Sequence, residues 1–291
     1  MKTYLFATDF SQTALQALHY AVPLVKRLKG KLILFHAYEF VSPYMEIPAN
    51  MIEQLNLEVR EEGLAQLKIW KDMVSGLAPE LSCEVEIRCG KAAQSIKDFA
   101  ELEKVDGIIM GTKGASGLKK FVMGSVASRT LVNAPCPVLL IPEEAVYQAW
   151  EKLVFATDFL PFPQAFFDQL KALAGEKGRL NFLHISPYYA EMNPQQYVAF
   201  RDFVKGSLPA EQVEFNIVPA DTVEKGLTSY VEVHRPDLLL MLTKRKDWIN
   251  KLIHGSEVKR HAFHPVVPVL VFHEENEAEA FVEASLQQAV N

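Results

Sequence analysis

The sequence predicts an α/β protein built from two tandem copies of one domain, each with a parallel sheet covered by helices. The chain has 291 residues, about twice the usual domain length of 100–150. Short, nearly continuous apolar runs alternate with helical patterns, which is typical of a parallel sheet buried on both faces. Several of these segments also recur later in the chain, which indicates a duplication.

The internal repeat consists of four pairs of matching segments. The pairs are YLFATDF at 4–10 with LVFATDF at 153–159, GKLILFHA at 30–37 with GRLNFLHI at 178–185, VDGIIMGTK at 105–113 with PDLLLMLTK at 236–244, and CPVLLIP at 136–142 with VPVLVFH at 267–273. The offset falls from 149 residues in the first pair to 131 in the last two. The second copy is therefore about 18 residues shorter, and the loss lies between His36 and Val105, where it removes much of the long helical pattern at 52–77 and the loop before it.

Each element of the first copy follows from its residue pattern. Apolar β-rich runs predict strands at 2–8, 31–37, 83–88, 106–110 and 137–141. Apolar residues at helical spacing predict helices at 12–29, 52–77, 92–103 and 125–133. Ser11 is the expected N-cap of the first helix, and Gly30 is expected to end it.

The repeat also predicts the domain boundaries. We expect one domain at 1–145, a second at 149–275 and a C-terminal tail at 276–291. Apolar residues recur at helical spacing in the tail, so a docked amphipathic helix and a disordered segment are both open interpretations. A docked helix would cover a sheet edge or a dimer contact.

Composition and charge exclude several classes of protein. A hydrophobic content of 49% argues against disorder, and a net charge of −6 argues against a nucleic-acid binder. The longest apolar runs, such as 238–242, are far shorter than the ~18 residues of a spanning helix. The N-terminus reaches Asp9 too soon for a secretory signal, and the three cysteines form no paired framework. We therefore expect a cytoplasmic protein with no membrane or nucleic-acid partner.

Two loops at the carboxyl ends of predicted strands carry the candidate chemistry, because ligands of open parallel α/β sheets bind there. The first loop is ATDFS at 7–11, and the second is MGTKGASGLKKFVMGSV at 110–126. The second loop contains the pattern Gly111-x2-Gly114-x9-Gly124-Ser125. Its glycines let a ligand approach the backbone, and the helix that begins at Ser125 presents free amides to an anion. The loop therefore predicts a site that suits a triphosphate chain.

These features resemble the universal stress protein family. The resemblance rests on the glycine spacing, the TDFS-type first loop and the closing strand APCPVLLIP at 134–142, and it covers the chain as two copies. It implies two Rossmann-like (adenine nucleotide alpha hydrolase-like) three-layer domains, each with a five-stranded parallel sheet of order 3-2-1-4-5. It also implies a nucleotide-responsive stress or regulatory factor that binds ATP in its N-terminal domain, with the role of Mg²⁺ left open.

The resemblance implies, position by position, which residues hold the nucleotide. Ala7 stands where many family members have proline, a change that alters loop stiffness more than chemistry. The implied contacts are Ala7 and Asp9 beside adenine and ribose, Ala37 at the base, Met110, Gly111, Lys113 and Gly114 along ribose and phosphate, and Gly124, Ser125 and Val126 at the phosphates.

The second copy departs from this pattern. Its three glycine positions are Leu242, Arg245 and Gly255, followed by Ser256. Because large side chains replace two glycines, we expect this copy to have lost nucleotide binding and to serve structure or pairing. An anion or an acidic partner at the basic run 244–246 stays open as an alternative.

No motif of a turnover enzyme is present, so we predict no catalytic residue and at most a weak ATPase. The sequence lacks GxxxxGK[ST], GxSxG, HExxH and a kinase catalytic loop. His36 and His184 occupy equivalent strand ends and are interpreted as packed histidines. A zinc site at His254, His261 and His264 is disfavoured, because no thiol or carboxylate lies at matching spacing. Metal binding otherwise stays unknown.

The competing hypothesis is a nucleotide-free scaffold or dimerisation protein that acts by binding a partner. In either case we expect the two domains to pair through their last strands, at 137–141 and 268–272. The sequence leaves open whether the chain also forms a homodimer.

Overall fold

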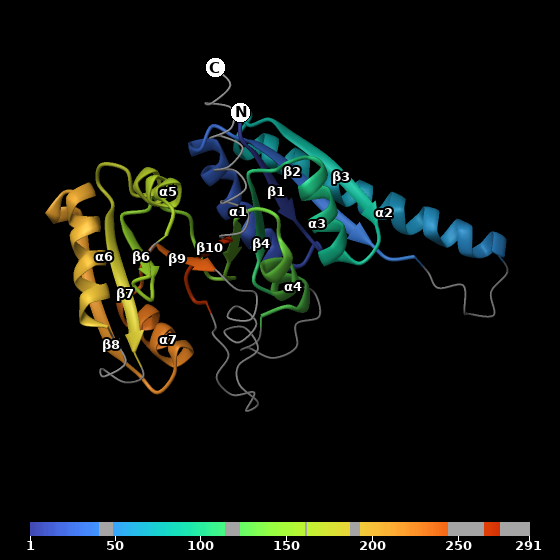
Figure 1. Ribbon diagram of the computed structural model, residues 1–291. Helices are drawn as coiled ribbons and strands as arrows, with labels where there is room; N and C mark the ends of the chain where they lie inside the picture. Colours follow the sequence, from blue (N-terminus) through green and yellow to red (C-terminus); the bar gives the residue numbers. More distant parts are fainter. Residues whose placement is uncertain (41–48, 114–122, 161, 187–192, 244–264, 274–291) are drawn as a thin grey trace, which may run out of the picture. The chain divides into compact units, whose positions relative to one another are not determined.

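The computed structural model describes residues 1–40, 49–113, 123–160, 162–186, 193–243 and 265–273. The chain divides into two compact units, Met1–Tyr147 and Gln148–Asn291 (Figure 1). The predicted tail at 276–291 lies outside the described residues. Among the described helices, none combines the length and the apolar character that a membrane crossing requires.

The first unit holds a five-stranded parallel sheet of order β3-β2-β1-β4-β5, which confirms the expected order 3-2-1-4-5. Its strands are β1 (Thr3–Ala7), β2 (Lys31–Tyr38), β3 (Cys83–Cys89), β4 (Gly107–Gly111) and β5 (Val138–Ile141). Its helices are α1 (Gln12–Arg27), α2 (Ala49–Leu77), α3 (Ala92–Leu102) and α4 (Ser125–Asn133). In the central register, Ala7 at the end of β1 pairs with Phe35 on one side and Met110 on the other.

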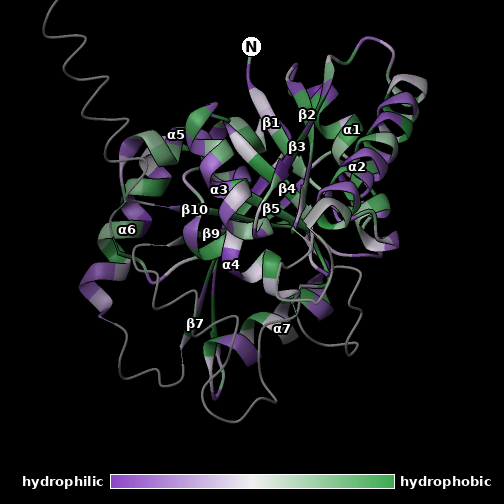
Figure 2. Cartoon of the chain, turned by 90° about the vertical axis from the view of Figure 1, so that its right-hand side faces the viewer, coloured by the Kyte–Doolittle hydropathy of each residue, from purple (hydrophilic) through white to green (hydrophobic). Residues whose placement is uncertain are grey.

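Helices cover both faces of this sheet. Phe6 of β1 points to one face, where its ring centroid lies 6.4 Å from that of Trp70 in α2. Phe35 of β2 points to the other face, where its ring lies 5.2 Å from Phe99 of α3, and α3 packs against α4. Hydrophobic residues run along the buried strands β4 and β5, whereas α2 carries mixed residues (Figure 2).

The second unit repeats the same order, as β8-β7-β6-β9-β10. Its strands are β6 (Lys152–Ala156), β7 (Arg179–Ser186), β8 (Val213–Pro219), β9 (Leu238–Thr243) and β10 (Val269–His273). Its helices are α5 (Gln164–Ala174), α6 (Pro194–Ser207) and α7 (Val223–His234), with a 3₁₀ turn, η2, at Ala210–Gln212. Helix α6 has 14 residues where α2 has 29, so the shortening lies where the change in offset predicts it.

Both ends of α1 can be compared with the caps that the sequence predicts. Ser11 is the N-cap as predicted, because its side chain accepts a hydrogen bond from the amide of Ala14. The helix ends before Gly30, whose amide donates to the carbonyl of Val25 at 3.0 Å, although the left-handed residue is Lys29, with φ 52°. Gly30 is also required by packing, because a Cβ there would lie 2.7 Å from the Tyr4 ring.

Removing this N-cap is expected to lower stability by about 1 kcal/mol in a Ser11→Ala variant, since one amide at the start of α1 loses its acceptor. Thermal melts of variant and wild type measure the loss. Asn193→Ala, which removes the side-chain cap of α6, is the matched change in the second unit. An unchanged melting temperature in Ser11→Ala would show that the cap is dispensable.

Candidate functional site

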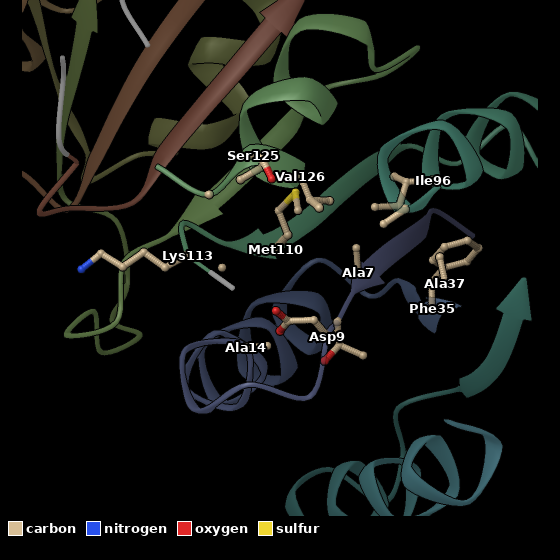
Figure 3. A pocket seen from close by; sticks show the side chains of 15 residues that line it. Ala7, Asp9, Ala14, Phe35, Ala37, Ile96, Met110, Lys113, Ser125 and Val126 are labelled. Atoms are coloured by element: carbon tan, nitrogen blue, oxygen red, sulfur yellow. The ribbon is translucent and has the colours of Figure 1, made fainter. Parts of the chain in front are cut away.

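A cavity of about 180 Å³ opens at the carboxyl ends of β1, β2 and β4 in the first unit (Figure 3). Nine of the ten residues predicted to hold the nucleotide line it, and the tenth, Gly114, lies outside the described residues. The predicted residues on its wall are Ala7, Asp9, Ala37, Met110, Gly111, Lys113, Gly124, Ser125 and Val126. The residues that sequence reasoning missed are Thr8, Ala14, Phe35, Ala92, Ile96 and Ala127.

The first loop is shaped by hydrogen bonds between its own neighbours. The Thr8 hydroxyl accepts from the amide of Phe10 at 2.9 Å, and the Asp9 carboxylate accepts from the amide of Ser11 at 3.1 Å. These bonds accompany a left-handed backbone at Phe10, φ 61°, which is unusual for a residue other than glycine. The loop thereby presents the exposed Asp9 at the cavity.

His36, near the end of β2, contacts this loop and holds it in place. Its Nδ1 lies 2.9 Å from the carbonyl oxygen of Thr8, and because a carbonyl only accepts, Nδ1 carries the hydrogen. Its ring centroid lies 4.4 Å from that of Phe10. The second unit repeats both contacts, with His184 against Thr157 and Phe159. The repetition supports the interpretation of both histidines as packed side chains.

Burial lowers the pKa of His36, against the opposing effects of its hydrogen bond to Thr8 and of the Asp9 charge. The unfolded chain therefore binds this proton more readily than the folded chain. The free energy of unfolding should fall as the pH drops below about 6.5 and continue to fall until the lowered folded pKa is passed.

A His36→Gln variant keeps a side-chain N–H for the Thr8 carbonyl but cannot titrate. We expect its melting temperature to change less between pH 7 and pH 5 than that of the wild type. The difference in melting temperature between the two proteins should be the same at pH 8 as at pH 7. Melts at four pH values measure this. Parallel curves for the two proteins would assign the acid sensitivity to other groups.

The helix α4 begins at the cavity without a side-chain cap. Its N-cap is Gly124, with φ −60° and ψ 146°, and a glycine has no side chain that could accept from the first turn. The amide of Gly124 donates to the carbonyl of Thr112 at 2.8 Å, which holds the cap against the end of β4. The next three residues, Ser125, Val126 and Ala127, line the cavity, and their amides have no intrahelical acceptor.

The two helices that begin at this cavity therefore differ. The start of α1 is satisfied by Ser11, whose hydroxyl takes the amide of Ala14 at 3.2 Å. The start of α4 presents to the cavity the amides of its first turn, which no carbonyl within the helix accepts, and the positive end of its dipole. An anionic group is the natural acceptor at that place.

The remaining wall is mostly small and apolar. It includes Ala7, Ala37 and Ala92, with the buried side chains of Ile96 and Met110 behind them. A flat apolar ring fits such a wall, because small residues leave room and larger ones offer contact.

Two of the predicted residues have roles that the sequence could not define. A Cβ on Gly111 would lie 3.2 Å from the Thr13 side chain of α1, so this glycine also serves the packing of α1. Lys113 lies at the edge of the cavity, and Figure 3 shows its ammonium group directed away from Asp9 and Met110. Lys113 is therefore placed beside the site rather than within its centre.

Metal ligands do not gather in the part of the chain that the structure describes, where no group of three His, Cys, Asp or Glu side chains could hold an ion. His254, His261 and His264 lie outside the described residues.

Comparisons with known proteins identify the family of the first unit. The model of the universal stress protein family matches residues 1–142. A universal stress protein of Methanocaldococcus jannaschii is 35% identical over 141 residues, which cover 48% of this chain and 81% of that protein. One from Thermus aquaticus is 31% identical, over 48% of this chain and 98% of its own length.

A solved structure shows the same fold over nearly the whole chain. The crystal structure of a universal stress protein from Archaeoglobus fulgidus matches with a TM-score of 0.68, covering 94% of this chain and 98% of its own, at 19% identity. The Methanocaldococcus and Thermus relatives are more than 30% identical and are covered over most of their length. On this evidence the chain belongs to the universal stress protein family.

Proposed function

We propose that the first unit binds an adenine nucleotide, ATP, and that the protein acts as a nucleotide-responsive stress or regulatory factor. The observation that carries this proposal is the start of α4, where the amides of Ser125, Val126 and Ala127 face the cavity under an N-cap with no side chain. Phosphate oxygens would accept these amides and interact favourably with the helix dipole.

The other parts of a nucleotide also find suitable surfaces. The adenine ring fits the apolar wall of Ala37, Ile96 and Met110, and the Asp9 carboxylate is placed to accept from ribose hydroxyls. Mg²⁺ is usually held by phosphates with one or two protein oxygens. The Asp9 carboxylate and the Ser125 hydroxyl are the oxygen ligands that this wall would supply.

Nucleotide sensing fits these residues better than turnover. Among the described residues of the wall, the charged side chains are Asp9 and Lys113, and Asp9 already accepts the Ser11 amide. We therefore assign no catalytic residue. A steady release of phosphate from ATP that is lost in a Gly124→Val variant would instead indicate a weak ATPase.

Two measurements on the full chain test the proposal. Protein purified without added nucleotide is extracted with acid and analysed for bound adenine nucleotides. Thermal melts are then recorded with ATP, ADP, AMP and cAMP, the last because a solved universal stress protein is a complex with cAMP. We expect ATP to raise the melting temperature. A chain that carries no nucleotide and is not stabilised by any of the four would favour the scaffold hypothesis.

A further inference from the structure

The second unit contains its own cavity, of about 500 Å³, at the carboxyl ends of β6, β7 and β9. Its described wall is Phe155, Ala156, Thr157, Asp158, Leu160, Phe162, Leu183, His184, Ile185, Val223, Leu227 and Leu242. The repeat aligns this wall with that of the first cavity: Ala156 and Asp158 correspond to Ala7 and Asp9. The duplicated fold has therefore kept a cavity at the place where open α/β sheets bind ligands.

Five positions around this cavity carry larger, more apolar residues than the first unit does. At the repeat offsets, Ala37 becomes Ile185, Ala92 becomes Val223, Gly111 becomes Leu242, Ser11 becomes Leu160 and Thr13 becomes Phe162. Each change replaces a small or polar residue with a larger apolar one. These five positions therefore carry more apolar side chain than their counterparts, and the cavity, at about 500 Å³ against about 180 Å³, is the larger of the two.

The polar side chains on the described wall make the same hydrogen bonds within their loop as Thr8, Asp9 and His36 make in the first unit. The Thr157 hydroxyl accepts from the amide of Phe159 at 2.9 Å, and the Asp158 carboxylate accepts from that of Leu160 at 3.0 Å. His184 donates through Nδ1 to the Thr157 carbonyl at 2.9 Å. Apart from these three polar residues, the described wall consists of hydrocarbon and aromatic side chains.

Helix α7 is adapted to this apolar wall. Gly226 lies inside α7, and a Cβ there would come within 2.4 Å of the Ile185 side chain. The corresponding residue of the first unit is Ser95, and the residue that aligns with Ile185 is the smaller Ala37. The glycine admits Ile185 to the cavity wall, so the apolar lining is accommodated by the helix that packs on it.

We propose that the second unit binds a small apolar molecule, one with an aliphatic or aromatic hydrocarbon body, in this cavity. The cavity lies in the size range of small-molecule sites, which are lined mainly by hydrophobic and aromatic side chains. Along the part of this wall that the structure describes, most side chains offer water no partner, whereas a hydrocarbon ligand removes their apolar surface from water. The proposal does not depend on nucleotide binding by the first unit.

The probe for the test is N-phenyl-1-naphthylamine, a neutral aromatic molecule whose fluorescence rises in apolar surroundings. We expect saturable binding to the full chain and displacement by 1-hexanol, 1-octanol and 1-decanol. Each added methylene should strengthen displacement about fourfold, the ratio that burial of one methylene group gives. A probe that does not bind, or displacement that does not increase with chain length, would overturn the proposal.

Matched substitutions locate the probe. Val223→Trp fills the second cavity from the first turn of α7, and Ala92→Trp makes the aligned change in the first cavity. We expect Val223→Trp to weaken probe binding at least tenfold, as an order of magnitude, while ATP stabilisation stays unchanged. Ala92→Trp should abolish stabilisation by ATP and leave probe binding unchanged.

A second variant keeps the test valid if Val223→Trp fails to fold. Leu160 is 40% exposed at the cavity, so Leu160→Glu brings a charge there at little cost in folding. It should also weaken probe binding, with a cooperative melt retained. Probe affinity equal to that of the wild type in both variants would show that the molecule binds elsewhere and would contradict the proposal.

Discussion

Replacing Ser125 by glutamate is expected to abolish stabilisation by ATP without weakening the ligand-free protein. Ser125 is the first residue of α4, and its side chain is exposed. A carboxylate there interacts favourably with the helix dipole, so the free protein should melt at the wild-type temperature or higher. The same charge repels phosphates. The loss of ligand response would therefore come from the site and not from unfolding.

The expected effect is large. A ligand at 100 times its dissociation constant adds about 2.7 kcal/mol to the free energy of unfolding, and Ser125→Glu should remove nearly all of it. Ser125→Gln adds similar bulk without charge and should keep much of the response. Gln195→Glu makes the same charge change in the first turn of α6 and should keep all of it. An intact ATP shift in Ser125→Glu would place the nucleotide elsewhere.

The second large effect concerns Gly226 in α7. An alanine in an exposed helix interior is normally more stable than glycine by about 1 kcal/mol. At Gly226 the added Cβ would lie 2.4 Å from the Ile185 side chain. We therefore expect Gly226→Ala to lower the free energy of unfolding by about 1–3 kcal/mol, the usual cost of overpacking. Denaturant unfolding of both proteins measures the difference.

The companion variant Ile185→Ala shows whether this contact is the cause. Alone it should cost about 2–5 kcal/mol, because Ile185 is buried. In its presence, Gly226→Ala should destabilise much less, since the Ile185 Cγ2 at 2.4 Å is gone and the Ala220 Cβ at 3.0 Å is the close contact that remains. Ala37 and Ser95 hold the aligned positions in the first unit. Costs that add to within about 0.5 kcal/mol would contradict a direct contact.

Much of the fold could be predicted because its periodicity is local and appears twice. The strand at 31–37 and the helix at 125–133 were placed within one residue of β2 and α4. The end of α1 was less predictable: Gly30 signals a helix stop, yet Lys29 takes the left-handed conformation. Gly30 is needed for its close approach to Tyr4, a contact between segments that no local pattern records.

The candidate site also contains residues that the sequence predicts and residues that only the structure reveals. Asp9 stands in the loop after β1 and Ser125 at the start of α4, where their chemistry is visible in the sequence, and the structure brings both to one cavity. Ala92 and Ile96 come from α3, where apolar residues look like any other helix face. Their place on the wall depends on how α3 packs on β2, so only the structure could reveal it.

The cavity of the second unit escaped prediction for a related reason. Leu242 in place of Gly111 indicated a lost nucleotide site, and nothing in the sequence gives the volume that remains around it. That volume depends on distances between elements, such as the close approach of α7 to Ile185 that Gly226 permits.

Calorimetric titration of the full chain with ATP tests most directly whether one unit of the duplicated protein is a nucleotide site. The start of α4 and its small apolar wall belong to the first unit, whereas the aligned wall of the second unit carries Ile185, Val223 and Leu242. We therefore expect a stoichiometry of one ATP per chain, lost in Ser125→Glu and kept in Val223→Trp. No binding, or two ATP molecules per chain, would contradict this division of function.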